Sequence, residues 1–386
     1  EGRSYFNYRG YYGTSGWDNY DIDNLNNGYM MPFAAILTCG TGGFEGSSDC
    51  NSERLAKVGT TTIPQGAIGA IGTATLSTHT CFNNCVDAGI FDGIFKDKIF
   101  NMGGALTRGK LSLYTSYPDN PNNAVSAFSY WNNLIGDPGL DLWTAVPKEF
   151  IVEYDDASIG QNYFTVTVKN DMNFPVQDAW VTILKEDEIF ETDFTNENGL
   201  VNLPLEYQGA DDIKITVSKH NFVSYLNTFN VIQQNAFIGI KEYEFDDDNS
   251  GSSSGNDDGL VNPGETVELN IDFKNFGLET LDNVEATLST NVEGINVLQN
   301  DMTLGTVESG ELVSSEEAFV FELGNQILGG TELNFQVIIS ADNGYEWIDY
   351  IETIVSGANL AYQSYLIHDD NNDILNPGET ADLEVT

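Results

Sequence analysis

A short apolar strand that ends in a cysteine and a glycine-rich turn constrains this sequence most strongly. The apolar residues 33–37 stop at Thr38-Cys39-Gly40, and three further glycines follow by Gly46. A buried strand that opens into such a turn places the thiol at the carboxyl edge of a sheet, where open α/β sheets hold ligands and chemistry. Glycines also let backbone N–H groups come close to a substrate oxygen. An arbitrary cysteine is more often a small buried residue, so the interpretation of Cys39 depends on the sequence around it.

Residues 1–147 alternate between strand-like and helix-like patterns, which predicts an α/β domain. Residues 10–28 are rich in Gly, Asn, Asp and aromatic side chains and are expected to form a loop. Predicted strands cover residues 4–9, 33–39 and 66–73, and predicted helices cover residues 52–58, 86–99, 102–117 and 124–134.

After Pro147 the helical periodicity disappears and period-two strands follow one another. Residues 148–234 are therefore expected to form an immunoglobulin-like β-sandwich, in which Asn198-Gly199 closes a pair of strands. The sequence LVNPGET at 260–266 recurs as ILNPGET at 374–380. This repeat predicts a β-sandwich over residues 235–357 and the start of a second copy, cut short, over residues 358–386.

The charge balance excludes several kinds of partner. The 386 residues include 15 Lys and Arg against 59 Asp and Glu, a formal net charge of −44, which disfavours nucleic acid and anionic membrane surfaces. The chain nevertheless has 41% hydrophobic and 12% aromatic residues, enough to fold. No stretch approaches a membrane span. The first and last residues lie within strand-like patterns, so we expect a fragment of a longer protein.

Two acidic clusters precede the repeated motif. Oxygen ligands on flexible loops suit Ca²⁺, although the spacing does not fit an EF-hand, and a solvated acidic loop explains the pattern equally well. A third oxygen-rich loop, around Asp18 and Asp21, is better explained by turn-forming residues. The candidate ligands are Asp246, Asp247, Asp248 and Asp257 in the first cluster and Asp369, Asp370 and Asp373 in the second.

The four cysteines all lie in the first quarter of the chain. Besides Cys39 they are Cys50, Cys81 and Cys85, among which one disulfide is compatible with an oxidising compartment. His79 follows the predicted strand at 66–73, so a parallel arrangement places it at the same sheet edge as Cys39. With Cys81 and Cys85 it gives only weak support for zinc. The remaining histidines, His220 and His368, are interpreted as surface residues.

The motifs of the first 147 residues resemble, in order and spacing, the C-terminal half of the gingipain-type cysteine peptidase domain of family C25, which has a caspase-like fold. The resemblance implies a multidomain protein, partly α/β and caspase-like, followed by all-β immunoglobulin-like sandwiches. The matching segments are NYRGYYGTSGW at 7–17, LNNGYMMPFAAILTCGTGGF at 25–44, CNSERLAKVG at 50–59, PQGAIGAIGTATLST at 64–78 and NNLIGDPGLDLW at 132–143.

The resemblance implies roles for individual residues. Cys39 corresponds to the nucleophile, Gly40 supplies an oxyanion N–H, and no cofactor is needed for catalysis. The family's base is a histidine in a Gly-His-Gly loop, but here Tyr11 stands at that position, within Gly10-Tyr11-Tyr12-Gly13. Tyrosine, with an ordinary pKa near ~10, is a poor proton shuttle at neutral pH. The substrate pocket would be shaped by Thr75, Leu76, Ser77 and Thr78.

Two hypotheses about function follow. The first is a secreted or cell-surface gingipain-like cysteine endopeptidase that forms a thioester between Cys39 and polypeptide substrates. Its activity would use His79 as a substitute base, or would survive weakly on Cys39 and the oxyanion site alone. The alternative is a catalytically degenerate relative that acts as an adhesin or binds peptides on host or surface proteins. A purely structural array with an inert Cys39 is a third, weaker interpretation. The resemblance further implies export by the type IX system, a preceding half of the peptidase domain and a sorting tail beyond residue 386.

Overall fold

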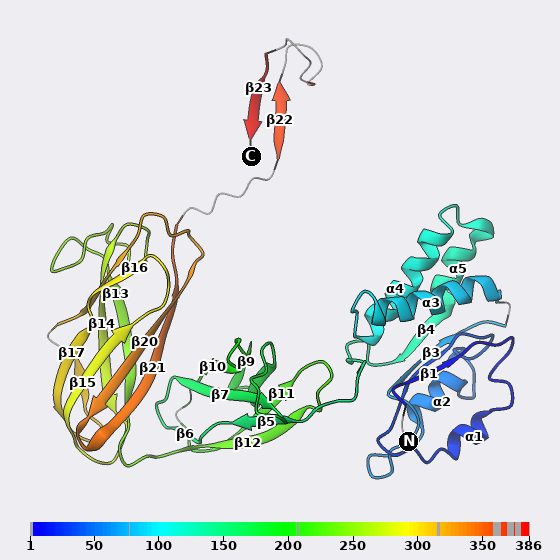
Figure 1. Ribbon diagram of the computed structural model, residues 1–386, viewed down its shortest axis with the longest axis horizontal. Coiled ribbons are helices and arrows are strands. Elements are labelled where there is room, and N and C mark those ends of the chain that lie inside the picture. The colour runs from blue at the N-terminus through cyan, green and yellow to red at the C-terminus, as the bar shows by residue number, and fades with distance from the viewer. Residues whose placement is uncertain are drawn as a thin grey trace. The chain divides into compact units, whose positions relative to one another are not determined.

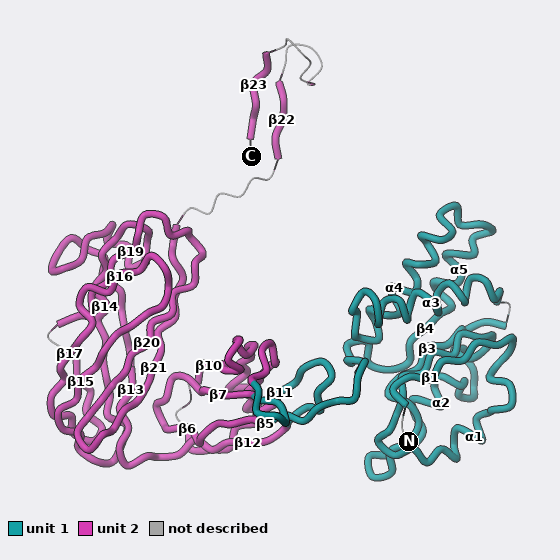
Figure 2. The backbone as a smooth tube through the Cα atoms, in the orientation of Figure 1, with its two compact units in different colours: residues 1–151, 169–174, 217–225 teal, residues 152–168, 175–216, 226–386 magenta. Residues whose placement is uncertain are grey.

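The computed structural model describes residues 3–76, 78–205, 207, 209–314, 317–357, 364–368, 374 and 380–385. It divides into two compact units, shown in different colours in Figure 2. Unit 1 comprises residues 1–151, 169–174 and 217–225, and unit 2 comprises residues 152–168, 175–216 and 226–386. The domain boundaries predicted from the sequence stay predictions, because these units divide the chain at other points.

A four-stranded sheet with the order β1-β2-β3-β4 forms the centre of unit 1 (Figure 1). Strand β1 (Tyr5–Tyr8) runs parallel to β2 (Phe33–Ile36), which runs parallel to β3 (Gly69–Thr73). The edge strand β4 (Asn132–Gly136) pairs with β3 in the antiparallel sense. All four residues of β2 are buried, as expected for a parallel strand covered on both faces.

Helices cover both faces of this sheet (Figure 1). Because successive strand residues point to opposite faces, Phe33 and Ile71 pack beneath α3, α4 and α5, while Ala34 and Ala70 pack against α1 and α2. The helices are α1 (Asn19–Asp23), α2 (Asn51–Lys57), α3 (Thr80–Phe95), α4 (Met102–Ser116) and α5 (Ala124–Trp131), with a 3-10 turn η1 (Pro121–Asn123) before α5.

The structure corrects three predicted elements of unit 1. The helix expected over 124–134 ends at Trp131, because residues 132–136 pair with β3 instead of continuing the helix. The loop expected over 10–28 contains α1, which begins where the Asp18 carboxylate accepts the backbone N–H groups of Tyr20 and Asp21. Helix α3 begins at Thr80, six residues before the predicted start at 86.

The first β-sandwich consists of two sheets, with the strand orders β10-β7-β5 and β6-β12-β11-β8-β9. The prediction for Asn198-Gly199 was wrong. This turn connects β9 to β10, which lie in different sheets, and β9 instead forms a hairpin with β8. The strands are β5 (Phe150–Glu153), β6 (Ala157–Ser158), β7 (Tyr163–Asn170), β8 (Trp180–Lys185), β9 (Ile189–Phe194), β10 (Leu200–Pro204), β11 (Asp212–Ser218) and β12 (Tyr225–Ile232).

The second β-sandwich, in unit 2, packs two sheets around a core that includes Phe273, Phe321 and Phe335. One sheet has the order β13-β14-β19-β16, with β18 paired to β14, and the other has the order β17-β15-β20-β21. The strands are β13 (Ile238–Asp246), β14 (Thr266–Asn275), β15 (Leu281–Ser289), β16 (Ile295–Gln299), β17 (Asp301–Val307), β18 (Leu312–Ser314), β19 (Phe319–Leu323), β20 (Glu332–Ala341) and β21 (Tyr345–Ile354), with the 3-10 turn η2 (Asp342–Gly344) between the last two.

The last two strands, β22 (Tyr365–His368) and β23 (Asp382–Val385), form an antiparallel pair. Their register matches that of the preceding copy. Tyr243 pairs with Ile271, eight residues after Pro263 (271 − 263), and Tyr365 pairs with Val385, eight residues after Pro377 (385 − 377). The shared register supports a second copy of the module.

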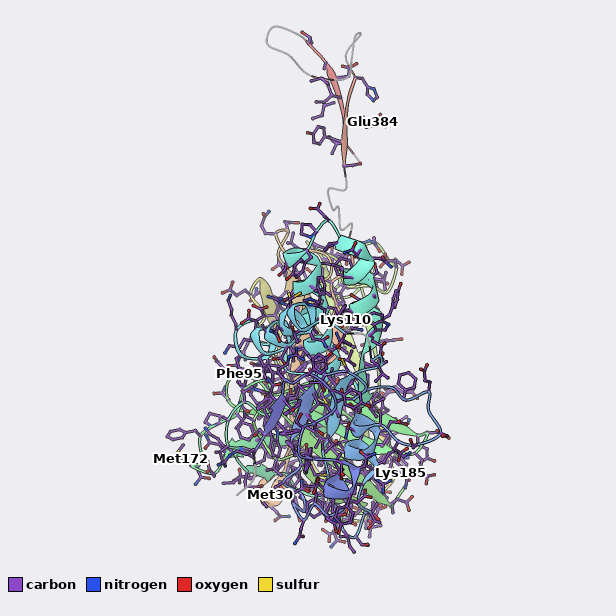
Figure 3. All side chains as sticks on the ribbon, turned by 90° about the vertical axis from the view of Figure 1, so that its right-hand side faces the viewer. Met30, Phe95, Lys110, Met172, Lys185 and Glu384 are labelled. Atoms are coloured by element: carbon purple, nitrogen blue, oxygen red, sulfur yellow. The ribbon has the colours of Figure 1, made fainter. Side chains whose placement is uncertain are left out.

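The predicted class, α/β followed by all-β sandwiches, is confirmed. Within the described residues, none of the helices has the length and apolar character needed to cross a membrane. Some apolar side chains, such as Met30, Phe95 and Met172, are exposed on the surface (Figure 3), which is normal for folded proteins.

Candidate functional site

The Cys39 thiol lies just beyond β2, and its residue is only 5% exposed. The loop after β1 is fixed against it. The Gly13 N–H donates to the Cys39 carbonyl at 3.1 Å, and the Thr38 hydroxyl donates to the Gly13 carbonyl at 2.7 Å. Tyr12 forms a parallel bridge with Cys39. The loops that follow the first two parallel strands therefore meet at the thiol.

The loop between β3 and α3 also reaches the thiol. The Cys39 sulfur lies 2.8 Å from the hydroxyl oxygen of Thr78, and either atom can be the donor. Thr78 directly precedes His79, the N-cap of the 16-residue helix α3. Among the predicted pocket residues, Thr78 contacts the sulfur, whereas Leu76 is exposed and Ser77 lies outside the described residues.

Gly40 has a left-handed backbone conformation with φ of 78°, and a side-chain carbon there would lie 3.0 Å from Leu76 Cδ2. Glycine is therefore favoured at this position. Its N–H donates to the Thr75 carbonyl at 2.8 Å. That N–H would have to leave Thr75 before it could bind an oxyanion, so the oxyanion role of Gly40 stays a prediction.

Tyr11, which stands at the position of the family's base, is 84% exposed. No hydrogen bond joins its hydroxyl to Cys39 in the described part of the chain. The chain therefore presents a surface tyrosine where the resemblance implies a histidine.

The His79 ring has a structural task at the start of α3. Its Nδ1 accepts the Cys81 backbone N–H at 3.3 Å, and the ring packs against Phe82. A neutral imidazole that accepts at Nδ1 carries its proton on Nε2, so Nε2 is then a donor. The described residues include no hydrogen bond between His79 and Cys39. To act as the substitute base, His79 would first have to give up its capping bond.

Arg9, directly after β1, is a residue that the sequence analysis missed. Its Nε and Nη2 donate to the Asn84 side-chain oxygen at 3.0 and 2.8 Å, and Nη2 also donates to the Thr80 carbonyl at 3.4 Å. Its Nη1 is buried and has no hydrogen-bond partner within the described residues. Burial lowers the pKa of Arg9, while the nearby Asp87 and Cys39 oppose this effect. A guanidinium therefore lies within electrostatic range of the thiol.

The other three cysteines form no disulfide in the structure. Cys50 is the N-cap residue of α2, whereas Cys81 and Cys85 lie one turn apart on α3. The Cys85 thiol donates to Ser112 and Ser116 on α4, at 3.3 Å in both cases. The disulfide that the sequence left open among these residues is therefore absent here.

His220 is not the free surface residue expected from the sequence. Within unit 1 its ring stacks on Phe100, with centroids 3.5 Å apart. Its Nδ1 lies 2.8 Å from an Asp141 carboxylate oxygen, and its Nε2 lies 2.9 Å from the Thr144 hydroxyl. The ring therefore has a structural role. His368, in contrast, is exposed and lies 2.9 Å from Glu384.

The first acidic cluster folds around the buried Asp247. Its carboxylate accepts four backbone N–H groups over 2.8–3.3 Å. Burial would raise the pKa of Asp247, but these hydrogen bonds outweigh it and hold the pKa below its ordinary value. Nowhere in the described residues do three or more His, Cys, Asp or Glu side chains form a group that could hold a metal. Asp369, Asp370 and Asp373 lie outside the described residues, so calcium binding stays a prediction.

Comparison with known proteins identifies the N-terminal part. Residues 1–143 match the model of peptidase family C25. The crystal structure of the Arg-specific cysteine proteinase gingipain R is similar with a TM-score of 0.51 and 21% identity, over 60% of this chain and 54% of that chain. The complex of Porphyromonas gingivalis RgpB pro- and mature domains is similar with a TM-score of 0.51 and 19% identity, over 60% of this chain and 55% of that chain.

Residues 1–143 therefore match peptidase family C25, as the motifs predicted, and the fold is similar to that of gingipain R. The chain spans about half the length of these two structures, 54% and 55%. At this level of identity the structural likeness concerns the fold. No curated protein matches the sequence.

Proposed function

We propose that this chain carries the nucleophile-bearing part of a secreted or cell-surface gingipain-like cysteine endopeptidase. The observation that carries the proposal is the position of the Cys39 thiol, beyond the buried strand β2 and in contact with Thr78, within the segment that matches family C25. Polypeptides are the proposed substrates. Export through the type IX system belongs to the same proposal.

The proposed reaction passes through a thioester. The thiol gives up its proton and the sulfur attacks the carbonyl carbon of a peptide bond, which forms a C–S bond. The C–N bond then breaks, and the leaving amine takes up one proton, which balances the proton that the thiol lost. Water then hydrolyses the thioester, which releases the carboxylic acid and restores the thiol. The Thr78 hydroxyl orients the sulfur, and the Gly40 N–H turns from Thr75 to the developing oxyanion.

A second candidate is a catalytically degenerate relative that binds peptides or surface proteins without cleaving them. Three observations favour it: Tyr11 is exposed, the Gly40 N–H is bound to Thr75, and the His79 Nδ1 caps α3. Each group that catalysis would require is therefore exposed to solvent or already engaged.

One pair of variants tests the first candidate against the second. The full chain is assayed on a broad fluorogenic peptide library with wild-type protein, Cys39→Ala and the control Cys50→Ala. Cleavage that Cys39→Ala abolishes and Cys50→Ala keeps would establish the peptidase. Cleavage that survives Cys39→Ala would show that the site is misassigned. If the wild type binds library peptides without cleaving them, and Cys39→Ala binds them equally well, the degenerate relative is the correct function.

A further inference from the structure

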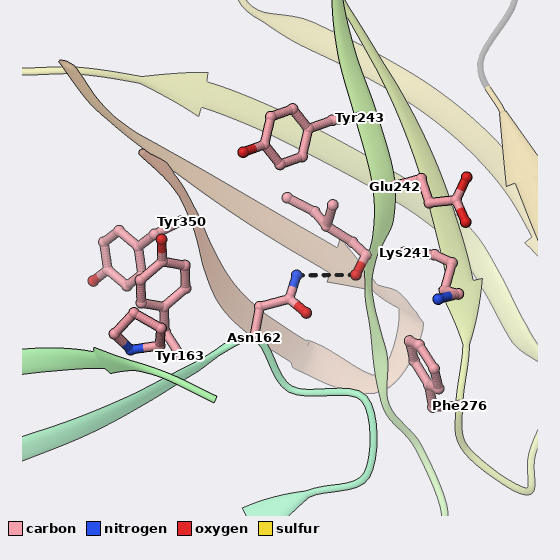
Figure 4. A pocket seen from close by; sticks show the side chains of 9 residues that line it. Asn162, Tyr163, Lys241, Glu242, Tyr243, Phe276 and Tyr350 are labelled. Carbon is pink, nitrogen blue, oxygen red and sulfur yellow. Dashed lines mark hydrogen bonds between the residues drawn. The ribbon is translucent and has the colours of Figure 1, made fainter. Parts of the chain in front are cut away.

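A cavity of about 570 Å³ lies within unit 2, where the first sandwich meets the second (Figure 4). The first sandwich contributes Asn162, Tyr163 and Pro204, and the second contributes residues of β13 and β21 together with Phe276, which directly follows β14. The volume falls within the range of small-molecule sites, roughly 300–1,000 Å³, and such sites occur preferentially where domains meet. The peptidase segment contributes no residue to this cavity, so its occupant is independent of the function proposed above.

Aromatic rings form much of the wall. Tyr163 and Tyr350 meet edge to face, with centroids 5.5 Å apart. Phe276 lies on the other side of the cavity in Figure 4. The Lys274 ammonium lies over its ring, 5.2 Å from the ring centroid. Tyr243 is 45% exposed, although tyrosine is large enough to favour burial. Half-exposed rings around a cavity offer flat apolar faces to a ligand.

A β-bulge gives the cavity two charged groups. The register between β13 and β14 shifts between Ile240 and Glu242, which leaves Lys241 as the extra residue. In a regular strand two successive side chains point to opposite faces, yet Lys241 and Glu242 both line the cavity and lie on the same side of it in Figure 4. Bulges often re-aim side chains at functional sites. Among the described residues, neither of these charged groups has a hydrogen bond or an ion pair.

The base of the cavity is fixed by a buried carboxylate. Asp349 is 5% exposed, and its Oδ2 accepts the Ile240 N–H at 3.0 Å and the Asn162 amide at 3.2 Å. The same amide nitrogen donates to the Ile240 carbonyl at 2.9 Å, drawn as a dashed line in Figure 4. These bonds join the two sandwiches, so the walls are organised before a ligand arrives, which lowers the entropic cost of binding.

We propose that this cavity binds a neutral saccharide. Half-exposed rings suit the apolar C–H faces of a sugar ring, and the adjacent ammonium and carboxylate can donate to and accept from neighbouring hydroxyl groups. Lys241 and Glu242 carry opposite charges, so these two side chains together do not favour a ligand of either charge. The formal charge of −44 on the whole chain disfavours anionic ligands further.

The test uses the labelled full chain on an array of neutral and charged glycans, followed by calorimetric titration with the neutral trisaccharide that binds best. We expect Lys241→Ala and Glu242→Ala each to weaken Kd roughly tenfold. Glu244→Ala is the matched control, because Glu244 lies on the same strand, is exposed and does not line the cavity. This control should leave Kd within about twofold of the wild-type value.

Three results would overturn the proposal: no neutral glycan binds, only charged glycans or peptides bind, or Lys241→Ala and Glu242→Ala bind like the wild type. Thermal melting of each variant checks that the sandwich is intact. If Glu242→Ala fails to fold, Tyr243→Phe and Lys241→Ala still test the site, since both alter exposed side chains.

Discussion

The sulfur of Cys39 lies 2.8 Å from the hydroxyl oxygen of Thr78. The described residues bring no histidine ring into hydrogen-bond contact with the thiol, so this hydroxyl is the side-chain partner that the structure gives it. A hydroxyl can donate to a thiolate but is too weak a base to take the thiol proton near neutral pH. Thr78 is therefore best understood as a positioning residue.

The first prediction concerns the Thr78 hydroxyl. Replacing it in Thr78→Val removes a donor to the thiolate while keeping the side-chain volume. A hydrogen bond to a charged group contributes about 1.5–3 kcal/mol, so we expect iodoacetamide to alkylate Cys39 roughly tenfold more slowly at neutral pH. Peptide mass spectrometry after timed labelling measures the rate. Thr78→Ser keeps the hydroxyl and should label like the wild type; equal rates for the valine and serine variants would contradict the positioning role.

The second prediction concerns Arg9, whose guanidinium is held by Asn84 and Thr80 and interacts electrostatically with Cys39. A positive charge favours the reactive thiolate. Arg9→Gln should slow the alkylation of Cys39 several-fold, to roughly one third of the wild-type rate or less. Arg9→Lys should keep most of the rate because it keeps the charge.

Arg54→Gln serves as the control, since Arg54 pairs with Asp23 and Asp49. If Arg9→Gln and Arg54→Gln have the same effect on the labelling rate, Arg9 has no particular influence on the thiol.

The sequence predicted the position of the thiol well because that position depends on local pattern. A continuous apolar run bounded by glycines defines β2, and the cysteine follows directly after it. The prediction of a helix over 124–134 was wrong at its C-terminal end because that end depends on long-range pairing and not on local pattern. The pattern of α5 continues through Leu134, and only the pairing of β4 with β3, between segments about 60 residues apart, shows that the helix has ended.

The contacts of the thiol could not be predicted in the same way. Thr78 lies 39 residues from Cys39, and Arg9 lies 75 residues from its partner Asn84. Both residues lie in segments that match family C25, and Thr78 was predicted to shape the substrate pocket, but the sequence pattern gave no indication of these particular contacts. The missing histidine was visible in the sequence, because an expected residue type at an expected position requires no tertiary information.

The third prediction separates the two roles of His79. His79→Asn removes the imidazole but keeps a good N-cap side chain, whereas His79→Ala removes both. Because Nδ1 is engaged with Cys81, we expect His79→Asn to keep any peptidase activity, and His79→Ala to lose about 1 kcal/mol of stability. Activity assays and chemical unfolding of both variants measure these effects. A stable but inactive asparagine variant would instead identify His79 as the base.

The fourth prediction concerns the acidic loop around Asp247. Three of the four backbone N–H groups donate to Oδ2 of Asp247 and one donates to Oδ1. Asp247→Asn removes the negative charge and replaces one of these oxygens with an NH₂ group, which cannot accept, so at least one backbone N–H loses its acceptor. We expect a loss of about 2–4 kcal/mol in the free energy of unfolding. Asp257→Asn is the control, because the Asp257 side chain is exposed. A thermal midpoint that does not respond to millimolar Ca²⁺ would leave the solvated acidic loop as the explanation; a Ca²⁺-dependent rise that Asp248→Asn abolishes would reveal a cation site.

The fifth prediction concerns pH. Burial raises the pKa of Asp349 to about 6, although backbone N–H groups of Ile240 and Tyr350 oppose this. An unfolded aspartate has a pKa near ~3.9, so the folded protein binds the extra proton between roughly pH 4 and pH 6. The resulting stabilisation is complete below about pH 4 and is lost as the pH rises through about 6, a change of about 3 kcal/mol.

Unfolding free energies of the wild type and Asp349→Asn, measured from pH 4 to pH 8, test whether stability falls as the pH rises. The unfolding free energy of the wild type should fall relative to that of Asp349→Asn as the pH rises, because only the wild type releases this proton. Glu244→Gln, an exposed change on β13, controls for the general effect of removing one acidic group from a chain of net charge −44. Parallel pH profiles for the wild type and Asp349→Asn would show that the carboxyl stays ionised in the folded protein.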